Sequence, residues 1–196
     1  MRSTFLCLAA ALLGAGLATH PTTSQPEAGT AIRMAVENLV DRADLVIEGH
    51  VASATPVDLD GVVYTDYQLL VDRTWWGEDL GSRTIRLPGG VLPSGRATMV
   101  PGMPSVVPGD DVILALTETD GLERRVVVGL SQGRWRVVGN GQGGKLAVRD
   151  SEGGALVLRP GATPVPSDRM DVMGYADLVS QLEAAAGARR ARGEDR

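Results

Sequence analysis

Short apolar stretches, each ended within a few residues by glycine, proline, asparagine or aspartate, recur from residue 45 to residue 158. The chain has 25 glycines and 11 prolines, which favour turns over long regular elements. Several stretches alternate apolar with polar residues, as half-buried strands do. The pattern predicts strands at residues 45–54, 62–76, 82–87, 110–116, 124–128, 133–138, 145–149 and 155–158. The fold is therefore expected to be mainly β.

One amphipathic segment stands at each end of this β region. Thr30 is a suitable N-cap for a helix that runs to about Asp41, and a second helix is expected from Ser167 or Asp168. The apolar residues that fall at helical spacing are Ile32, Ala35, Val36, Leu39 and Val40 in the first segment, and Met170, Met173, Leu178, Val179 and Leu182 in the second. Short strands flanked by two helices predict a small OB-like β-barrel with an N-terminal and a C-terminal helix.

The chain divides into four parts. Residues 1–18 have the character of a signal peptide, and residues 19–29 are polar and proline-bearing, as a disordered lead-in would be. Residues 30–186 form the single OB-like domain, and residues 187–196 are expected to be a disordered basic and acidic tail. A hairpin turn is predicted at Asp60-Gly61 within the domain.

The first part points to export. Arg2 precedes an uncharged, mostly apolar run of 14 residues from Thr4 to Leu17, and Gly16 and Ala18 place small residues at a cleavage site. As a helix this run reaches roughly 21 Å, short of the ~30 Å hydrocarbon core of a bilayer. We expect cleavage after Ala18, a secreted or periplasmic location, and no stable membrane insertion afterwards.

Composition excludes several kinds of chemistry for the processed chain. Cys7 is the one cysteine, and it lies within the signal segment, so disulfides, thiol catalysis and zinc–thiolate sites are not expected. Removal of Arg2 leaves 18 basic against 24 acidic residues, a formal charge of −6. Because nucleic-acid binding needs clustered cations, we expect no nucleic-acid partner. The dense basic cluster Arg189–Arg192 is assigned to the solvated tail.

Three groups of residues carry a resemblance to known proteins. They are Asp44–Val51 (DLVIEGHV), a following strand with Thr65 and Val71 that ends at Trp76-Gly77, and Pro108–Leu114 (PGDDVIL). Together they resemble the opening of the netrin/tissue-inhibitor-of-metalloproteinase-like OB barrel. With Leu87–Gly90, Val100–Pro104 and Gly129–Trp135 added, the pattern over residues 35–140 is similar to uncharacterised secreted proteins of bacteria. The resemblance implies fold and compartment. The family's inhibitors use an N-terminal cysteine amine, which the processed chain lacks.

Candidate reactive groups each have a plainer interpretation. His20 lies in the lead-in, so a Ser-His-Asp site would need His50, which sits in a strand pattern where solvent exposure is the default. Asp58 and Asp60, and likewise Asp110 and Asp111, suit turns better than metal binding. The glycine-rich stretch 139–144 lacks the lysine and helix of a phosphate loop and suits a hairpin. No catalytic residue, metal or cofactor is predicted.

Binding is the favoured functional hypothesis. Residues 88–109 form a long, irregular loop, and such loops are usually functional or disordered. The many apolar residues of this loop argue against disorder. The predicted partner-binding residues are Met99, Met103, Val106, Trp75, Trp76 and Trp135, with core packing left open as the alternative for both the loop and the tryptophans. Because successive strand side chains alternate, one of Trp75 and Trp76 is expected to face away from the core.

The sequence therefore predicts an exported, non-enzymatic domain that binds a protein or peptide, with an exported protease as one candidate partner. Two alternatives stay open: a hydrolase that uses two carboxylates, and a structural protein of the cell envelope.

Overall fold

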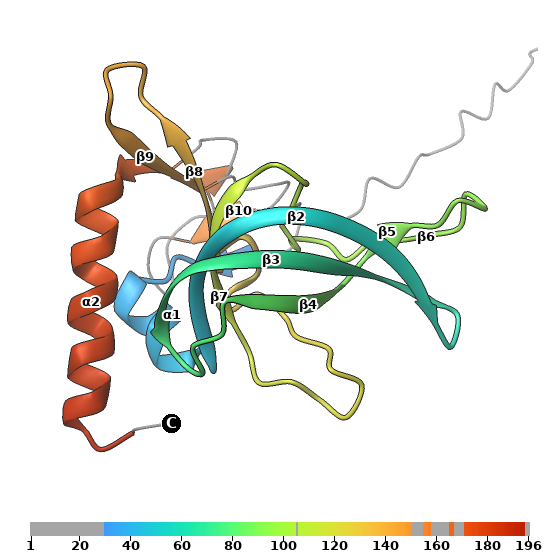
Figure 1. The fold of residues 1–196 in the computed structure, drawn as a ribbon, viewed down its shortest axis with the longest axis horizontal. Helices are drawn as coiled ribbons and strands as arrows, with labels where there is room; N and C mark the ends of the chain where they lie inside the picture. Colours follow the sequence, from blue (N-terminus) through green and yellow to red (C-terminus); the bar gives the residue numbers. More distant parts are fainter. Residues whose placement is uncertain (1–29, 105, 150–154, 158–164, 167–170, 195–196) are drawn as a thin grey trace, which may run out of the picture.

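A computed structural model describes residues 30–104, 106–149, 155–157, 165–166 and 171–194. The expected signal peptide and lead-in, residues 1–29, lie outside the described residues, and so does Met170. The described part is mainly β, which confirms the predicted fold class. Figure 1 shows the strands gathered on one side of the long C-terminal helix.

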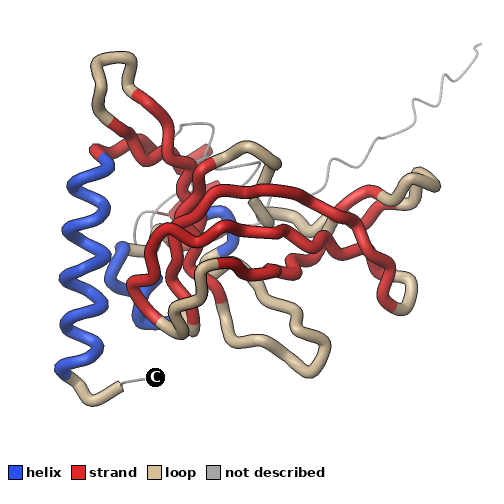
Figure 2. Tube along the Cα trace, viewed as in Figure 1, coloured by secondary structure: helices blue, strands red, loops and turns tan. Residues whose placement is uncertain are grey.

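The elements in chain order are β1 (Thr30–Ile32), α1 (Val36–Arg42), β2 (Leu45–Leu59), β3 (Val62–Trp76), β4 (Ser82–Pro88), β5 (Gly90–Val91), β6 (Ala97–Thr98), β7 (Asp111–Leu116), the 3₁₀ turn η1 (Leu130–Gly133), β8 (Arg134–Gly139), β9 (Lys145–Arg149), β10 (Ala155–Val157), β11 (Val165–Pro166), β12 (Asp171–Gly174) and α2 (Tyr175–Ala191). Seven of the strands form one antiparallel sheet in the order β12-β9-β8-β7-β2-β3-β4. Two small sheets, β1-β10-β11 and β5-β6, accompany it. Figure 2 shows loops at the ends of the strands, including the long connection from β6 to β7.

The β2–β3 hairpin has the predicted turn. Leu59 pairs with Val62 across Asp60 and Gly61, whose φ angles of 51° and 87° are those of a type I′ turn. The Asp58 carboxylate accepts a hydrogen bond from the Gly61 N–H at 3.0 Å and fixes the turn. The two strands are 15 residues each, so the hairpin reaches well beyond the body of the molecule (Figure 1).

The central sheet is buried on both faces. Ile113 and Ala115 of β7 join a cluster that packs against α1 and α2, whereas Val112, Leu114 and Leu116 join a second cluster on the opposite face. This explains the unbroken apolar sequence of β7, because a strand covered on both sides has no polar face. We call the two clusters the helix-side core and the loop-side core.

The predicted closed barrel is not formed by the described strands. The expected strand 124–128 is instead an irregular segment between β7 and β4. The Arg125 N–H donates to Arg86 O and the Val128 N–H to Ala115 O, both at 2.9 Å. Only isolated bridges form there among the described residues, because left-handed φ angles at Glu123 (58°) and Gly129 (66°) turn the backbone at both ends.

Both helices begin later than predicted. Thr30 is not the N-cap of α1, because residues 30–32 pair with β10 as a parallel strand and the helix starts at Val36. The predicted helical position Met173 lies in β12, where it pairs with Ala147 of β9, and α2 starts at Tyr175. Strand pairing with β9 therefore prevails over the helical apolar pattern at residues 171–174.

The expected tail is partly helical and firmly attached. Residues 187–191 continue α2, and Arg189 is buried rather than solvated. Its Nη1 donates to Val40 O at 2.8 Å and to Ala43 O at 2.5 Å at the end of α1, and its guanidinium lies 4.1 Å from the ring centre of Trp76. One side chain thus joins α2, α1 and β3.

Candidate functional site

The irregular loop before β7 divides between surface and core. Met99 is 89% exposed, whereas Val106 is 5% exposed and belongs to the loop-side core. Met103 lies between these extremes, partly buried and packed against the same core. Of the three predicted loop residues, Met99 is on the surface, Met103 is at its boundary, and Val106 is structural.

A cleft of about 250 Å³ lies beside this loop, and we call it the methionine cleft. Its lining includes Tyr67, Leu87, Pro88, Met99, Val100 and Met103. Strands β3 and β4 supply one wall and the loop supplies the other. The residues are mostly apolar, and Tyr67 adds a phenol. Burial raises the pKa of Tyr67, so its hydroxyl stays protonated at neutral pH and is able to donate a hydrogen bond.

Hydrogen bonds hold the loop in place. The Val63 N–H donates to Thr98 Oγ1 at 2.8 Å, and the Thr65 hydroxyl donates to Gly89 O at 2.7 Å. Gly90 is required here, because its φ is 142° and an added Cβ would lie 2.4 Å from Thr65 Oγ1. The cleft is therefore built on a rigid frame, with an exposed methionine at its rim.

The three tryptophans are not surface anchors. Trp75, Trp76 and Trp135 are 4%, 3% and 1% exposed, and all three belong to the helix-side core. The side chains of β3 do not alternate at Trp75 because of a β-bulge. Val46 pairs with Trp76, but the next residue, Ile47, pairs with Thr74. The extra residue places both indoles on the same side of the sheet. The structure therefore contradicts the expectation that one of Trp75 and Trp76 faces away from the core, and it favours core packing, the alternative left open for the three tryptophans.

The remaining sequence candidates occupy structural positions. His50 Nδ1 lies 2.9 Å from Asp111 Oδ1, as an exposed cross-strand pair. Asp58 serves the hairpin turn and forms an ion pair with Arg96. In the loop between β8 and β9, Asn140 Oδ1 accepts hydrogen bonds from two backbone N–H groups, as expected of a hairpin loop. Within the described residues, no group of three or more His, Cys, Asp or Glu side chains is arranged to hold a metal ion.

One buried polar pair, Glu48 and Tyr175, was not predicted from the sequence. Glu48 is 6% exposed, and its carboxylate oxygens lie 2.8 and 3.0 Å from the hydroxyl of Tyr175. Burial, and then the hydrogen bond to Glu48, raise the pKa of Tyr175 to about 12. Glu48 lies two residues after Val46 on β2 and therefore on the same, helix-side face of the strand, which the strand pattern predicts. Its partner Tyr175 lies 127 residues away and could not be predicted from that pattern. The pair docks the start of α2.

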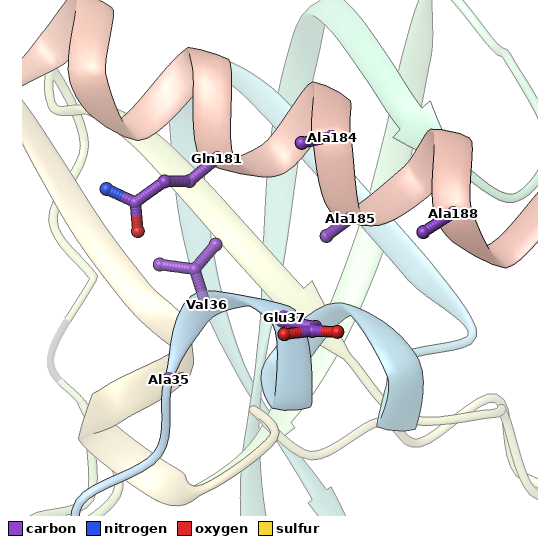
Figure 3. Close-up of a pocket in the computed structure, with 7 residues that line it drawn as sticks. All are labelled: Ala35, Val36, Glu37, Gln181, Ala184, Ala185 and Ala188. Carbon is purple, nitrogen blue, oxygen red and sulfur yellow. The ribbon is translucent and has the colours of Figure 1, made fainter.

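A groove of about 400 Å³ runs between the two helices. Figure 3 shows its lining: Ala35, Val36 and Glu37 at the start of α1 face Gln181, Ala184, Ala185 and Ala188 of α2. The walls consist mostly of methyl groups, and Glu37 and Gln181 are the polar side chains in the lining. The groove is a consequence of small residues at a helix contact, and the methionine cleft is the better candidate site.

Within the described residues, no helix combines the length and the apolar character needed to cross a membrane. Comparisons of the chain with protein-family models, with curated proteins and with solved structures give no match.

Proposed function

We propose that the chain is an exported, non-enzymatic domain that binds a protein or peptide partner at the methionine cleft. The exposure of Met99 is the observation that carries the proposal. An apolar side chain that is 89% exposed gains nothing from folding, yet the loop that presents it is fixed by hydrogen bonds to β3. A rigid frame that presents an apolar side chain is what a binding loop provides.

The chemistry of the cleft supports a peptide or protein rather than a reacting substrate. Methionine is flexible and polarisable, and it adapts to different apolar side chains. Tyr67 offers one hydrogen-bond donor beside these apolar walls. Further exposed apolar side chains come from the same stretch of chain, namely Val91 at 63% and Val107 at 50%. The predicted signal peptide of residues 1–18 supports a partner outside the cytoplasm, and an exported protease is one candidate.

Site-specific photo-crosslinking tests the proposal. A photoreactive methionine analogue at position 99, in the chain produced by exporting cells, is expected to give a discrete covalent adduct with one protein. The same analogue at Leu122 is the control, because Leu122 is also exposed, at 45%, but lies on another loop. A Met99→Ser competitor should suppress the adduct less than the native chain does. The absence of any adduct specific to position 99 would overturn the proposal.

A further inference from the structure

A second cleft, of about 380 Å³, lies between α1 and η1, and we call it the arginine cleft. It is lined by Arg33, Met34, Asn38, Arg42, Gly129, Leu130 and Gln132. Two cations and two side-chain amides surround an apolar floor made by Met34 and Leu130. No carboxylate is present among these described lining residues, although the whole chain carries a formal charge of −5.

The positive charge of this cleft is incompletely neutralised. The Arg42 side chain is exposed and forms no hydrogen bond or ion pair with the other described residues. Arg33 uses Nη2 to bond Asp171 at 2.6 Å, but Arg149 also lies 3.9 Å from that carboxylate. The nearby Arg33 charge adds to the burial that lowers the pKa of Arg149 to about 10. Asp171 thus serves two cations, and none of the described residues accepts a hydrogen bond from the Arg42 guanidinium.

The apolar floor is held in a fixed shape. Gly129 and Leu130 have left-handed φ angles of 66° and 59°, and a Cβ at Gly129 would lie 2.9 Å from Met34 Sδ. The Met34 N–H donates to the buried side chain of Gln132 at 2.7 Å. The floor therefore exists before any ligand binds, which lowers the entropy cost of binding.

One turn, residues 100–103, is in contact with the linings of both clefts. Val100 and Met103 line the methionine cleft, and the Met103 N–H closes the turn on Val100 O at 3.1 Å. Between them, Gly102 O accepts a hydrogen bond from the Ser131 N–H at 2.9 Å, and a Cβ at Gly102 would lie 2.9 Å from the side chain of Leu130. The turn therefore connects the loop wall of the methionine cleft to the apolar floor of the arginine cleft.

We propose that the arginine cleft is the second half of the partner-binding surface, and that the bound segment is an acidic peptide whose carboxylates meet Arg33 and Arg42 while a neighbouring apolar side chain enters the methionine cleft. The inference rests on the proposed function and names its ligand. Charge complementarity selects this occupant, because guanidinium groups recognise carboxylates with directed, charge-assisted hydrogen bonds.

Selection from a phage-displayed library of dodecapeptides on the immobilised full chain tests both proposals separately. The enriched peptides are expected to combine Asp or Glu with a large apolar residue, and their synthetic forms should bind less tightly as salt rises. Arg42→Gln should weaken the binding of an enriched peptide about fivefold, as loss of an exposed ion pair of about 1 kcal/mol does. Lys145→Gln removes the same charge from β9, outside both clefts, and should leave the affinity unchanged.

The outcomes separate the two proposals. Enrichment of apolar peptides without acidic residues, or equal affinities for the Arg42→Gln and Lys145→Gln chains, would overturn the acidic-ligand inference alone. Failure to enrich any peptide whose binding depends on Met99 would overturn the proposed function and this inference together.

Discussion

Replacement of Arg189 by methionine tests how α2 is held to the rest of the fold. Methionine keeps the aliphatic stem but removes the guanidinium, which donates to Val40 O and Ala43 O and stacks on Trp76. Two hydrogen bonds from a charged donor contribute about 1.5 kcal/mol each, and a desolvated cation–π contact contributes about 2 kcal/mol. Release of an arginine side chain returns about 2 kcal/mol of rotamer entropy. The free energy of unfolding should therefore fall by about 3 kcal/mol.

Urea denaturation followed by tryptophan fluorescence and circular dichroism measures this loss. For a domain of this size the melting temperature should fall by about 6–12 °C. Arg192→Met is the matched control, since Arg192 bonds Asp41 and Glu194 at the solvent-exposed end of the same helix, and no measurable change is expected. Equal unfolding free energies for the two variants would refute the assignment of Arg189 as the side chain that fixes α2.

Three further predictions address the core, the buried pair and export. Gly133→Ala should cost about 3 kcal/mol, because its Cβ would lie 2.3 Å from Val128 O, whereas Gly139→Ala has nothing within 4 Å and should be neutral in the same urea assay. Because the pKa of Tyr175 is raised from 10.0 to about 12, its bond to Glu48 stabilises the fold fully below pH 10 and is lost as the pH rises through about 12. Phenolate absorbance should show a tyrosine that titrates near 12 and that Tyr175→Phe removes, and a Tyr175 that titrates near 10 would contradict the buried pair. N-terminal sequencing of exported protein should begin at Thr19, and retention of Met1 would refute the signal peptide.

The strands were largely predictable because alternation and turn residues act locally. Residues 62–76 and 145–149 are strands with the bounds that the sequence indicated, and Asp60-Gly61 forms the expected turn. Strand pairing between segments that are distant in the sequence was harder to predict. Met173 falls at helical spacing, but it lies in β12 because residues 171–174 pair with β9. No residue near Thr30 indicated its parallel partner β10.

The candidate site was predictable only in part. The irregular loop and Met99 followed from composition, and Met99 is exposed. The exposure expected for one residue of the pair Trp75-Trp76 is not observed because a bulge at Trp75 breaks strict alternation, and a bulge leaves little trace in a single sequence. The burial of Arg189 was not predictable from its local sequence, because its acceptors lie about 150 residues earlier, at Val40 and Ala43.

The double burial of β7 changes what determines strand register. In a sheet with one solvent-exposed face, a slip of the strand by one residue would expose its apolar side chains to water, and the hydrophobic effect therefore opposes the slip. A slip in β7 would exchange one apolar set for another. What differs between the sets is volume: Ile113 and Ala115 face the helices, and Val112, Leu114 and Leu116 face the loop. The position opposite the helices that Ala115 occupies would then have to admit a leucine. Steric fit, rather than the hydrophobic effect, determines the register of the central strand.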